Sequence, residues 1–193
     1  MRPINREPKM RIVAGNRRGA KLVAPTGLDA RPTADRVRES LFNILDGGRF
    51  GDPYRGQLVV DAFAGTGGLG LEALSRGARH TVFLEQAIPS RKALFQNIRA
   101  LRYEEITTVI DGDATTLRRP ATDTAGLILL DPPYNSSLAA PCLEALKKYG
   151  WVGGDALVVV EVGAKEDCVL PEWLEELDSR RYGAARLVFG GVV

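Results

Sequence analysis

Short apolar runs recur along most of the chain and alternate with segments whose apolar residues have helical spacing. Each run is short enough for one buried strand of a parallel sheet. Strands that alternate with helices predict βαβ units with right-handed crossovers, so we expect an α/β fold with a mostly parallel sheet. The predicted strands are residues 58–60, 81–84, 107–110, 127–130 and 156–160, and the predicted helices are residues 34–45, 69–76, 89–100 and 138–148.

The two ends of the chain depart from this alternation. Residues 11–14 and 21–24 are strand-like and flank residues 15–19, Gly-Asn-Arg-Arg-Gly, whose composition favours a turn. We therefore predict a β-hairpin with a basic tip that leans on the main domain. At the other end we expect a short helix over residues 172–177 and two antiparallel β segments over residues 180–193.

The predicted helix over residues 34–45 combines an apolar stripe with charged side chains. Thr33 is the candidate N-cap residue. We interpret the stripe as core packing rather than as a cofactor surface. The stripe consists of Val37, Leu41, Ile44 and Leu45, and Arg36, Arg38 and Glu39 lie mostly off it.

The composition is that of one soluble globular domain: 193 residues, 45% hydrophobic and 26% charged. No apolar run approaches the length of a membrane span, and residues 1–9 lack the apolar core of a secretory signal. Cys142 and Cys168 match no metal or redox spacing. We therefore expect a cytoplasmic protein in a reducing compartment, with no metal and no membrane partner.

The net charge is only +2, but it is unevenly distributed. Residues 1–60 contain twelve Lys or Arg and six Asp or Glu, a balance of +6, so the remainder carries −4. A basic N-terminal third suggests a polyanionic partner at that end. A solvated surface without a partner would have the same balance.

A glycine loop over residues 61–70 follows the predicted strand 58–60 and opens the next helix. Gly65, Gly67 and Gly70 satisfy the G-x-G-x-x-G pattern of nucleotide-binding loops. Glu85 closes the next strand, where a ribose-binding carboxylate is expected. Nicotinamide enzymes and S-adenosylmethionine (SAM) enzymes share these features, so the loop alone leaves both classes open.

Three further features favour SAM. Asp61 ends the strand before the glycines, where it can help to hold an ammonium group, and Asp113 is placed to accept from an adenine amino group. Asp131-Pro132-Pro133-Tyr134 follows the fourth strand and has no evident part in hydride transfer. Its prolines stiffen the backbone, so a carboxylate, carbonyl oxygens and a ring are presented together, which suits a planar amine.

Three blocks carry a family resemblance: residues 10–19, 31–45 and 70–77. With the Asp-Ala-Phe-Ala-Gly-Thr-Gly motif that starts at Asp61, and with Asp-Pro-Pro-Tyr, they resemble the bacterial 16S ribosomal RNA guanine-N2 methyltransferases (RsmD-like). These are class I SAM-dependent methyltransferases, and the similarity covers essentially all of residues 10–193. Asp-Pro-Pro-Tyr alone is also typical of DNA adenine or cytosine amine methyltransferases.

The resemblance implies a Rossmann-like class I methyltransferase fold: a seven-stranded, mostly parallel sheet with an antiparallel C-terminal strand, plus a small N-terminal β-hairpin extension. The expected division is a polar leader (1–9), an RNA-binding extension (10–30) and a SAM-dependent methyltransferase domain (31–193). The implied reaction is methyl transfer to the exocyclic N2 amine of a guanine in 16S rRNA, numbered 966. The expected partner is 16S rRNA or a small-subunit assembly intermediate, and the expected oligomeric state is a monomer.

The family resemblance also implies which residues form the site, by their positions in the matching motifs. Asp131 and the Pro132 carbonyl would accept the two N–H groups of the target amine, and Tyr134 would stack on the base. The implied catalytic residues are Asp131, Pro132, Pro133 and Tyr134, and the implied cofactor residues are Asp61, Ala64, Gly65, Thr66, Gly67, Glu85, Asp113 and Ala114. The expected RNA contacts are Arg11, Arg17, Arg18, Lys21, Arg31 and Arg36.

Three alternatives remain open at this point. The same site would serve a DNA adenine or cytosine amine methyltransferase, although a short hairpin without a separate DNA-reading domain speaks against it. An NAD-dependent oxidoreductase is a more remote reading of the glycine loop. A non-catalytic RNA-binding module is disfavoured by the intact motifs.

Overall fold

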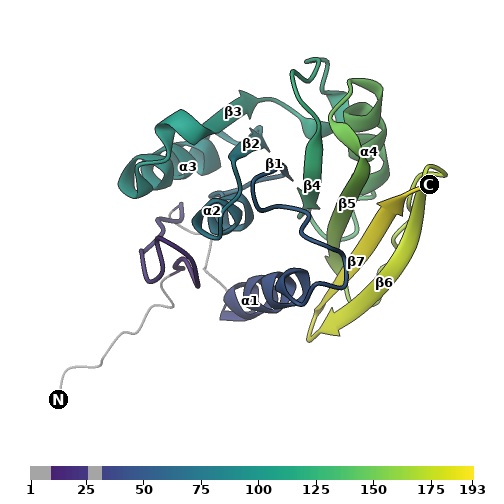
Figure 1. The fold of residues 1–193 in the computed structure, drawn as a ribbon, viewed down its shortest axis with the longest axis horizontal. Coiled ribbons are helices and arrows are strands. Elements are labelled where there is room, and N and C mark those ends of the chain that lie inside the picture. The colour runs from purple at the N-terminus through teal and green to yellow at the C-terminus, as the bar shows by residue number, and fades with distance from the viewer. Residues whose placement is uncertain (1–9, 26–31) are drawn as a thin grey trace.

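The computed structural model describes residues 10–25 and 32–193 of the chain (Figure 1). The predicted leader (1–9) and Arg31, one of the expected RNA contacts, lie outside the described residues.

The described residues form a seven-stranded sheet with the order β3-β2-β1-β4-β5-β7-β6. The first five strands in this order are mutually parallel, and β7 runs antiparallel to both β5 and β6. This confirms the predicted fold class, including the reversed C-terminal strand. The strands are β1 (Leu58–Ala62), β2 (His80–Glu85), β3 (Thr107–Asp111), β4 (Ala125–Leu130), β5 (Val152–Gly163), β6 (Leu174–Tyr182) and β7 (Ala185–Val192).

Helices cover both faces of the sheet, which explains why nearly every residue of the central strands β1 and β4 is buried. Val59 and Leu127 pack on one side with α1, α2 and α3, whereas Val60 and Ile128 pack on the other side with α4. The helices are α1 (Pro32–Asp46), α2 (Gly68–Ser75), α3 (Ile88–Leu101) and α4 (Ala139–Lys148), with short 3-10 turns η1 (Glu104–Ile106) and η2 (Ala114–Thr116).

Two local predictions are wrong. Residues 172–177 do not form a helix, because β6 begins at Leu174 and pairs with β7 over its whole length. Pairing across the sheet satisfies the backbone of this segment, and that long-range partner is invisible in the local pattern. Thr33 is not an N-cap residue, because α1 already begins at Pro32, where proline suits the first turn of a helix.

The N-terminal segment, residues 10–25, folds back on itself as predicted but pairs through a single antiparallel bridge, Arg11 with Lys21. Backbone hydrogen bonds join Ile12 and Ala20 (2.9 Å) and Leu22 and Met10 (2.8 Å). A longer ladder does not form because the next N–H groups bind elsewhere. Ile12 and Leu22 are buried in the main core.

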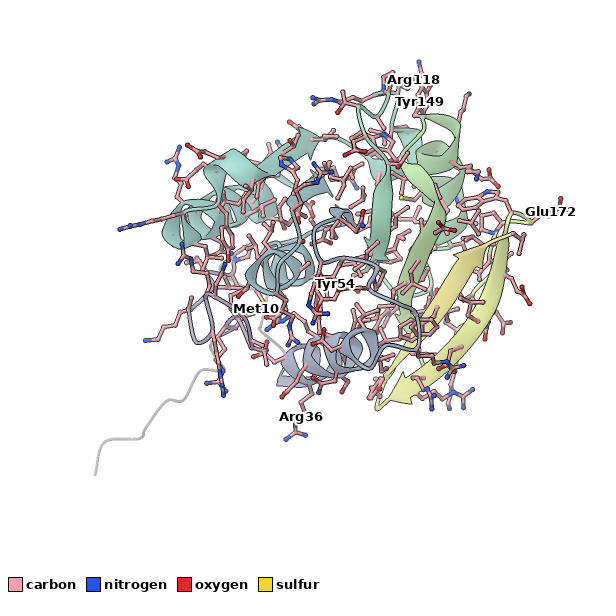
Figure 2. All side chains as sticks on the ribbon, in the orientation of Figure 1. Met10, Arg36, Tyr54, Arg118, Tyr149 and Glu172 are labelled. Atoms are coloured by element: carbon pink, nitrogen blue, oxygen red, sulfur yellow. The ribbon has the colours of Figure 1, made fainter. Side chains whose placement is uncertain are left out.

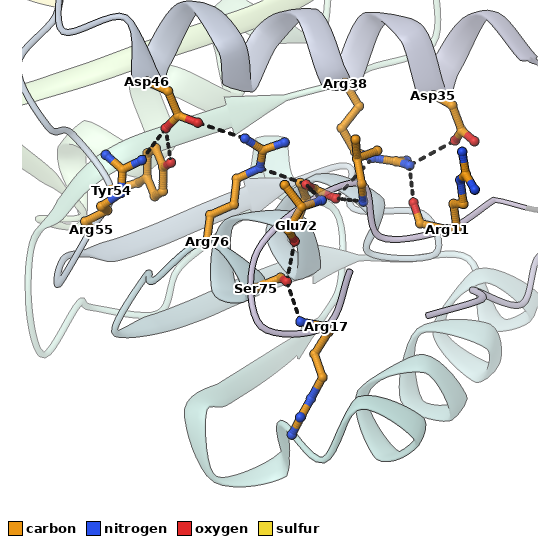
Figure 3. A network of polar contacts seen from close by, with 12 residues as sticks. Arg11, Arg17, Asp35, Arg38, Asp46, Tyr54, Arg55, Glu72, Ser75 and Arg76 are labelled. Carbon is orange, nitrogen blue, oxygen red and sulfur yellow. Dashed lines mark hydrogen bonds and ion pairs between the residues drawn. The ribbon is translucent and has the colours of Figure 1, made fainter. Parts of the chain in front are cut away.

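Two polar side chains of α2 hold the N-terminal segment (Figure 3). The carboxylate of Glu72, fully buried, accepts hydrogen bonds from the backbone N–H groups of Val13 (2.7 Å) and Ala14 (2.9 Å). The hydroxyl of Ser75 donates to the Ala14 carbonyl (2.6 Å) and accepts from the Arg17 N–H (3.0 Å). The segment is therefore attached by specific hydrogen bonds as well as by apolar contacts.

Arg38 differs from what its position off the apolar stripe of α1 suggested. Its side chain is only 4% exposed. Its Nη2 donates to the Arg11 carbonyl (2.6 Å) and to Asp35 (2.9 Å), and its Nε lies 3.8 Å from the Glu72 carboxylate. Arg76 binds the other Glu72 oxygen at 2.7 Å. Two arginines thus neutralise the buried Glu72, which is the condition for a buried charge to be tolerated.

Candidate active site

A cleft of about 750 Å³ opens at the carboxyl ends of the parallel strands, where open α/β sheets bind ligands. Its volume is within the range of small-molecule sites. It is lined by Val37, Phe63, Gly65, Leu84, Glu85, Gln86, Ala87, Gly112, Ala114, Asp131, Pro132, Pro133, Tyr134, Leu138, Glu161, Ala184 and Ala185.

All four residues of the Asp-Pro-Pro-Tyr motif line this cleft. The Asp131 N–H approaches the carbonyl of Ala62, the last residue of β1, at 3.4 Å, which ties the motif to the glycine loop's strand. Beyond the motif, Asn135 and Ser137 both have positive φ (57° and 54°). Non-glycine residues held in this region cluster at functional sites.

Tyr134 is held in place by a residue that the sequence reasoning missed. Its hydroxyl donates to the carboxylate of Glu161 in β5 (2.8 Å). Burial raises the pKa of Glu161, and the hydrogen bond from Tyr134 opposes that shift. Glu161 ends a run of buried valines in the same way that Glu85 ends β2, so the signal was present in the sequence.

Glu85 fixes the glycine loop. One oxygen of its carboxylate accepts from the Gly65 N–H (2.7 Å), and the other accepts from the Ala87 N–H (2.7 Å) at the start of α3. A carboxylate has about four acceptor sites, so both oxygens retain capacity toward the cleft. A Cβ at Gly65 (φ 55°) would meet no atom within 4 Å, which leaves open space beside this residue of the cleft lining.

Asp61 lies beneath the cleft and does not line it. Its carboxylate, 1% exposed, accepts from the Gly70 N–H (2.8 Å) and so helps to position the first turn of α2. Burial raises the pKa of Asp61 well above its usual range; the Gly70 hydrogen bond opposes this, and the charges of Asp131 and Glu85 add to it. The charges of Asp131 and Glu85 thus oppose ionisation of Asp61, and a cationic ligand would relieve this repulsion.

Asp113, the predicted adenine-binding residue, and Ala114, the predicted cofactor residue next to it, line different pockets. Ala114 lines the cleft, whereas Asp113 lines a neighbouring pocket of about 410 Å³. One carboxylate oxygen of Asp113 accepts from both the N–H and the hydroxyl of Thr115 (2.8 Å each). The role of Asp113 in cofactor binding stays a prediction.

The remaining predicted cofactor residues, Ala64, Thr66 and Gly67, belong to the glycine loop but lie outside the cleft lining. The Thr66 carbonyl accepts from the amide of Asn97 (3.0 Å), a fully buried residue of α3. These residues therefore lie on the side of the loop that faces the protein interior or α3, and not on the side that lines the cleft.

The expected RNA contacts differ in their surroundings. Arg11, Arg18 and Lys21 are exposed, and Arg36 points away from α1 into solvent (Figure 2). Arg17 is half-buried, and its Nε donates to the Leu101 carbonyl at 2.9 Å. Its guanidinium is thus already used within the protein, while the RNA-binding role of the whole set stays a prediction.

Metal sites and membrane spans are both absent from the residues that the structure describes. In residues 10–25 and 32–193, no group of three or more His, Cys, Asp or Glu side chains is arranged to hold a metal ion. In the same residues, no helix combines the length and the apolar character that crossing a membrane requires.

Comparison with known proteins places the chain in a family. A family model described as Conserved hypothetical protein 95 matches residues 10–191. Ribosomal RNA small subunit methyltransferase D of Haemophilus influenzae is 34% identical over 172 residues, covering 87% of this chain and 86% of that protein. Its Escherichia coli namesake is 34% identical over 158 residues, covering 79% and 74%.

A solved structure supports the same grouping. The Escherichia coli protein yhhF superposes with a TM-score of 0.80 at 30% identity, covering 95% of this chain and 98% of that chain. The motifs, the fold and these matches together show that the chain belongs to the Conserved hypothetical protein 95 family, the RsmD-like methyltransferases that its sequence resembles.

Proposed function

We propose that this protein transfers a methyl group from SAM to the exocyclic N2 amine of a guanine in small-subunit ribosomal RNA, guanine 966 of the 16S molecule. The observation that carries the proposal is that Asp-Pro-Pro-Tyr and the Glu85-anchored glycine loop line one cleft. The relatives' names, ribosomal RNA small subunit methyltransferase D, support the RNA substrate.

The cleft fits SAM on electrostatic grounds. Asp61, Glu85 and Asp131 lie close enough that each of the other two raises the pKa of Asp61, so a ligand with ammonium and sulfonium charges is favoured there. Glu85 would accept the ribose hydroxyls, and the open space beside Gly65 would admit the ligand's main body. When bound, SAM supplies an electrophilic methyl group on its sulfonium.

The residues of the motif would prepare the amine. The lone pair of a guanine amine is delocalised into the ring, so the free base is a poor nucleophile. Asp131 and the Pro132 carbonyl would accept its two N–H groups and favour a pyramidal nitrogen. Because the nitrogen becomes acidic once it gains the methyl group, Asp131 can take the departing proton without being a strong base.

Tyr134 would orient the base. Its hydroxyl is fixed by Glu161, and the residue as a whole is 38% exposed and lines the cleft. A ring anchored at one end can stack on a base and hold it in line with the methyl donor. A guanine within a duplex must first be exposed, at a cost of about a few kcal/mol.

The deciding experiment is methyl transfer from isotopically labelled SAM to free 16S rRNA, small-subunit particles and duplex DNA in parallel. Digestion to nucleosides and mass spectrometry should show N2-methylguanosine from RNA and no label in DNA. Methylated adenine or cytosine from DNA would instead establish the alternative amine methyltransferase. A thermal shift with NAD and none with SAM would overturn the proposal in favour of an oxidoreductase.

A further inference from the structure

Helix α3 carries a solvent-facing stripe beyond the RNA contacts proposed above. Its first four members are spaced at three or four residues, so they share one face of the helix, and the last is the C-cap residue that follows α3. Leu94 and Ile98 are buried on the opposite face. Ile88 and Phe95 are unusually exposed for apolar residues, at 59% and 47%. The α3 stripe consists of Ile88, Lys92, Phe95, Arg99 and Arg102.

The charge of this region has one sign. Residues 86–103 contain four basic residues and no acidic one. Arg91 is paired with Asp111 at 2.6 Å. Within the part of the chain that the structure describes, none of the ion pairs involves Lys92, Arg99 or Arg102.

The N-terminal segment lies against α3 and continues the same charge. Residues 10–25 also contain four basic residues and no acidic one. Asn97 of α3 accepts from the Val23 N–H (2.7 Å) and donates to the Val23 carbonyl (3.0 Å). Arg17 binds the Leu101 carbonyl and lies over the Tyr103 ring, 5.5 Å from its centroid. The N-terminal segment and the α3 stripe therefore adjoin and form one basic surface, which the exposed acids Glu104, Glu105 and Asp111 border.

We propose that the α3 stripe binds the phosphate backbone of the substrate RNA and that Phe95 stacks on an unpaired base. This inference rests on the proposed function and extends it to a surface that the N-terminal segment does not supply. An aromatic ring between exposed cations matches the chemistry of single-stranded nucleic acid. The stripe starts at Ile88, next to Gln86 and Ala87 of the cleft lining, so RNA bound along it reaches the cleft.

The test of the phosphate contacts is a pair of matched double variants of the full chain. Lys92→Gln with Arg99→Gln removes two charges from the stripe, and Lys147→Gln with Lys148→Gln removes two exposed charges from the last turn of α4. The first variant should bind small-subunit RNA about tenfold more weakly near 0.15 M salt, with a salt slope lower by about 1.5. The second should retain the wild-type affinity and slope.

The test of the stacking contact is Phe95→Leu against Phe95→Tyr. The leucine variant should bind an RNA with unpaired bases about fivefold more weakly at an unchanged salt slope, because it loses the ring and no charge. The tyrosine variant should bind as the wild type does. On heparin, which has no bases, all three proteins should bind equally.

Several results would overturn the inference. One is a wild-type salt slope in the Lys92/Arg99 variant, another is an equal loss in the α4 control, and a third is tighter binding to anionic lipid vesicles than to RNA. Failure of the proposed function has a different signature, since the wild-type protein would then neither bind nor methylate small-subunit RNA. SAM binding, followed by thermal shift, should be the same in every variant and confirms that each one is folded.

Discussion

The cleft and the basic surface adjoin each other and are built from opposite charges. The cleft concentrates Asp131, Glu85 and, just beneath, Asp61, whose pKa is raised first by burial and then by the charges of the other two. The basic surface combines the N-terminal segment with the α3 stripe, and neither of these stretches contains an acid. Because the two signs of charge are segregated, a cationic donor and a polyanionic substrate would be attracted to different, adjoining surfaces of the molecule.

The two regions also differ in how their charges are held. In the cleft, backbone N–H groups stabilise the carboxylates: Gly65 and Ala87 bind Glu85, and Gly70 binds Asp61. At the basic surface, most of the cations are exposed, and those of the N-terminal segment depend on its attachment to α2 and α3. The cleft should therefore respond to single changes in chemistry, and the basic surface to loss of that attachment.

The largest expected effect comes from replacing Asp131, which should change the cleft and leave the basic surface unaffected. Asp131→Ala should lower the rate of methyl transfer by about 10³-fold or more, because the amine loses its charged acceptor. SAM binding by calorimetry and RNA binding by filter assay should stay within about twofold of wild type. Asp155→Ala, an exposed acid elsewhere on the sheet, should have no effect on the rate. Normal turnover by the Asp131 variant would exclude the mechanism.

Glu72→Ala should break the basic surface while sparing the cleft. It removes the acceptor for Val13 and Ala14 and leaves Arg38 and Arg76 without their buried counter-ion. The free energy of unfolding should fall by about 3 kcal/mol in urea titrations, as expected for a broken buried ion pair. In the protein that remains folded, RNA should bind more weakly and SAM should still bind.

Glu144→Ala is the matched control for that change, since Glu144 is an exposed glutamate of α4. It should alter the free energy of unfolding by less than about 0.5 kcal/mol. Equal losses in the two variants would show that Glu72 has no special part in attaching the N-terminal segment.

Asp61→Asn tests whether ionisation of the buried Asp61 carboxylate destabilises the folded protein. An acid whose folded-state pKa is raised destabilises the folded protein when ionised, so stability is lost as pH rises from the unfolded value of about 4 toward the folded value. Asparagine keeps an acceptor for Gly70 but cannot ionise, so the melting temperature at neutral pH should rise and its fall with increasing pH should flatten. The affinity for SAM should drop by up to about tenfold, because a negative charge beneath the cleft is lost. A melting temperature that falls at all pH values would contradict this account.

Tyr134→Phe should have the smallest effect. The ring is kept, so methyl transfer should slow only about threefold, as expected when one hydrogen bond of modest net energy is lost. Because the Tyr134 hydrogen bond lowers the pKa of Glu161 against the effect of burial, its removal should raise that pKa further. An NMR titration of the Glu161 carboxyl carbon in the two proteins measures the shift, and a lower pKa in the variant would show that the contact is unimportant in solution.

Much of the fold was predictable because local periodicity suffices for buried strands and amphipathic helices. The five parallel strands and the helices that link them lie where the pattern predicts. Residues 172–177 were misassigned because an edge strand is defined by its partner, β7, and not by its own pattern. Arg38 looked like a surface residue because only the folded chain brings Glu72 and the Arg11 carbonyl to it.

The candidate site shows the same division. The sequence places Asp131, Glu85 and Gly65 at strand ends, and the structure brings all three to one cleft. The sequence could not reveal that Asp61 and Asp113 lie outside the cleft lining. Both carboxylates bind backbone N–H groups nearby, and the directions of those groups depend on the fold. Glu161 was discoverable as a strand-end acid, but its contact with Tyr134 required β4 and β5 to be neighbours.

The sequence by itself determined the parallel strands, the helices between them, the glycine loop and the motif, because each depends on contacts within a few residues along the chain. Only the tertiary structure decided which carboxylates share a cleft, and that the N-terminal segment lies along α3 to form one basic surface. Those outcomes depend on buried polar groups such as Glu72 and Asn97, whose partners lie some 58 and 74 positions away in sequence. Burial of such groups without a partner is costly, so the fold fixes both their positions and the surfaces they join.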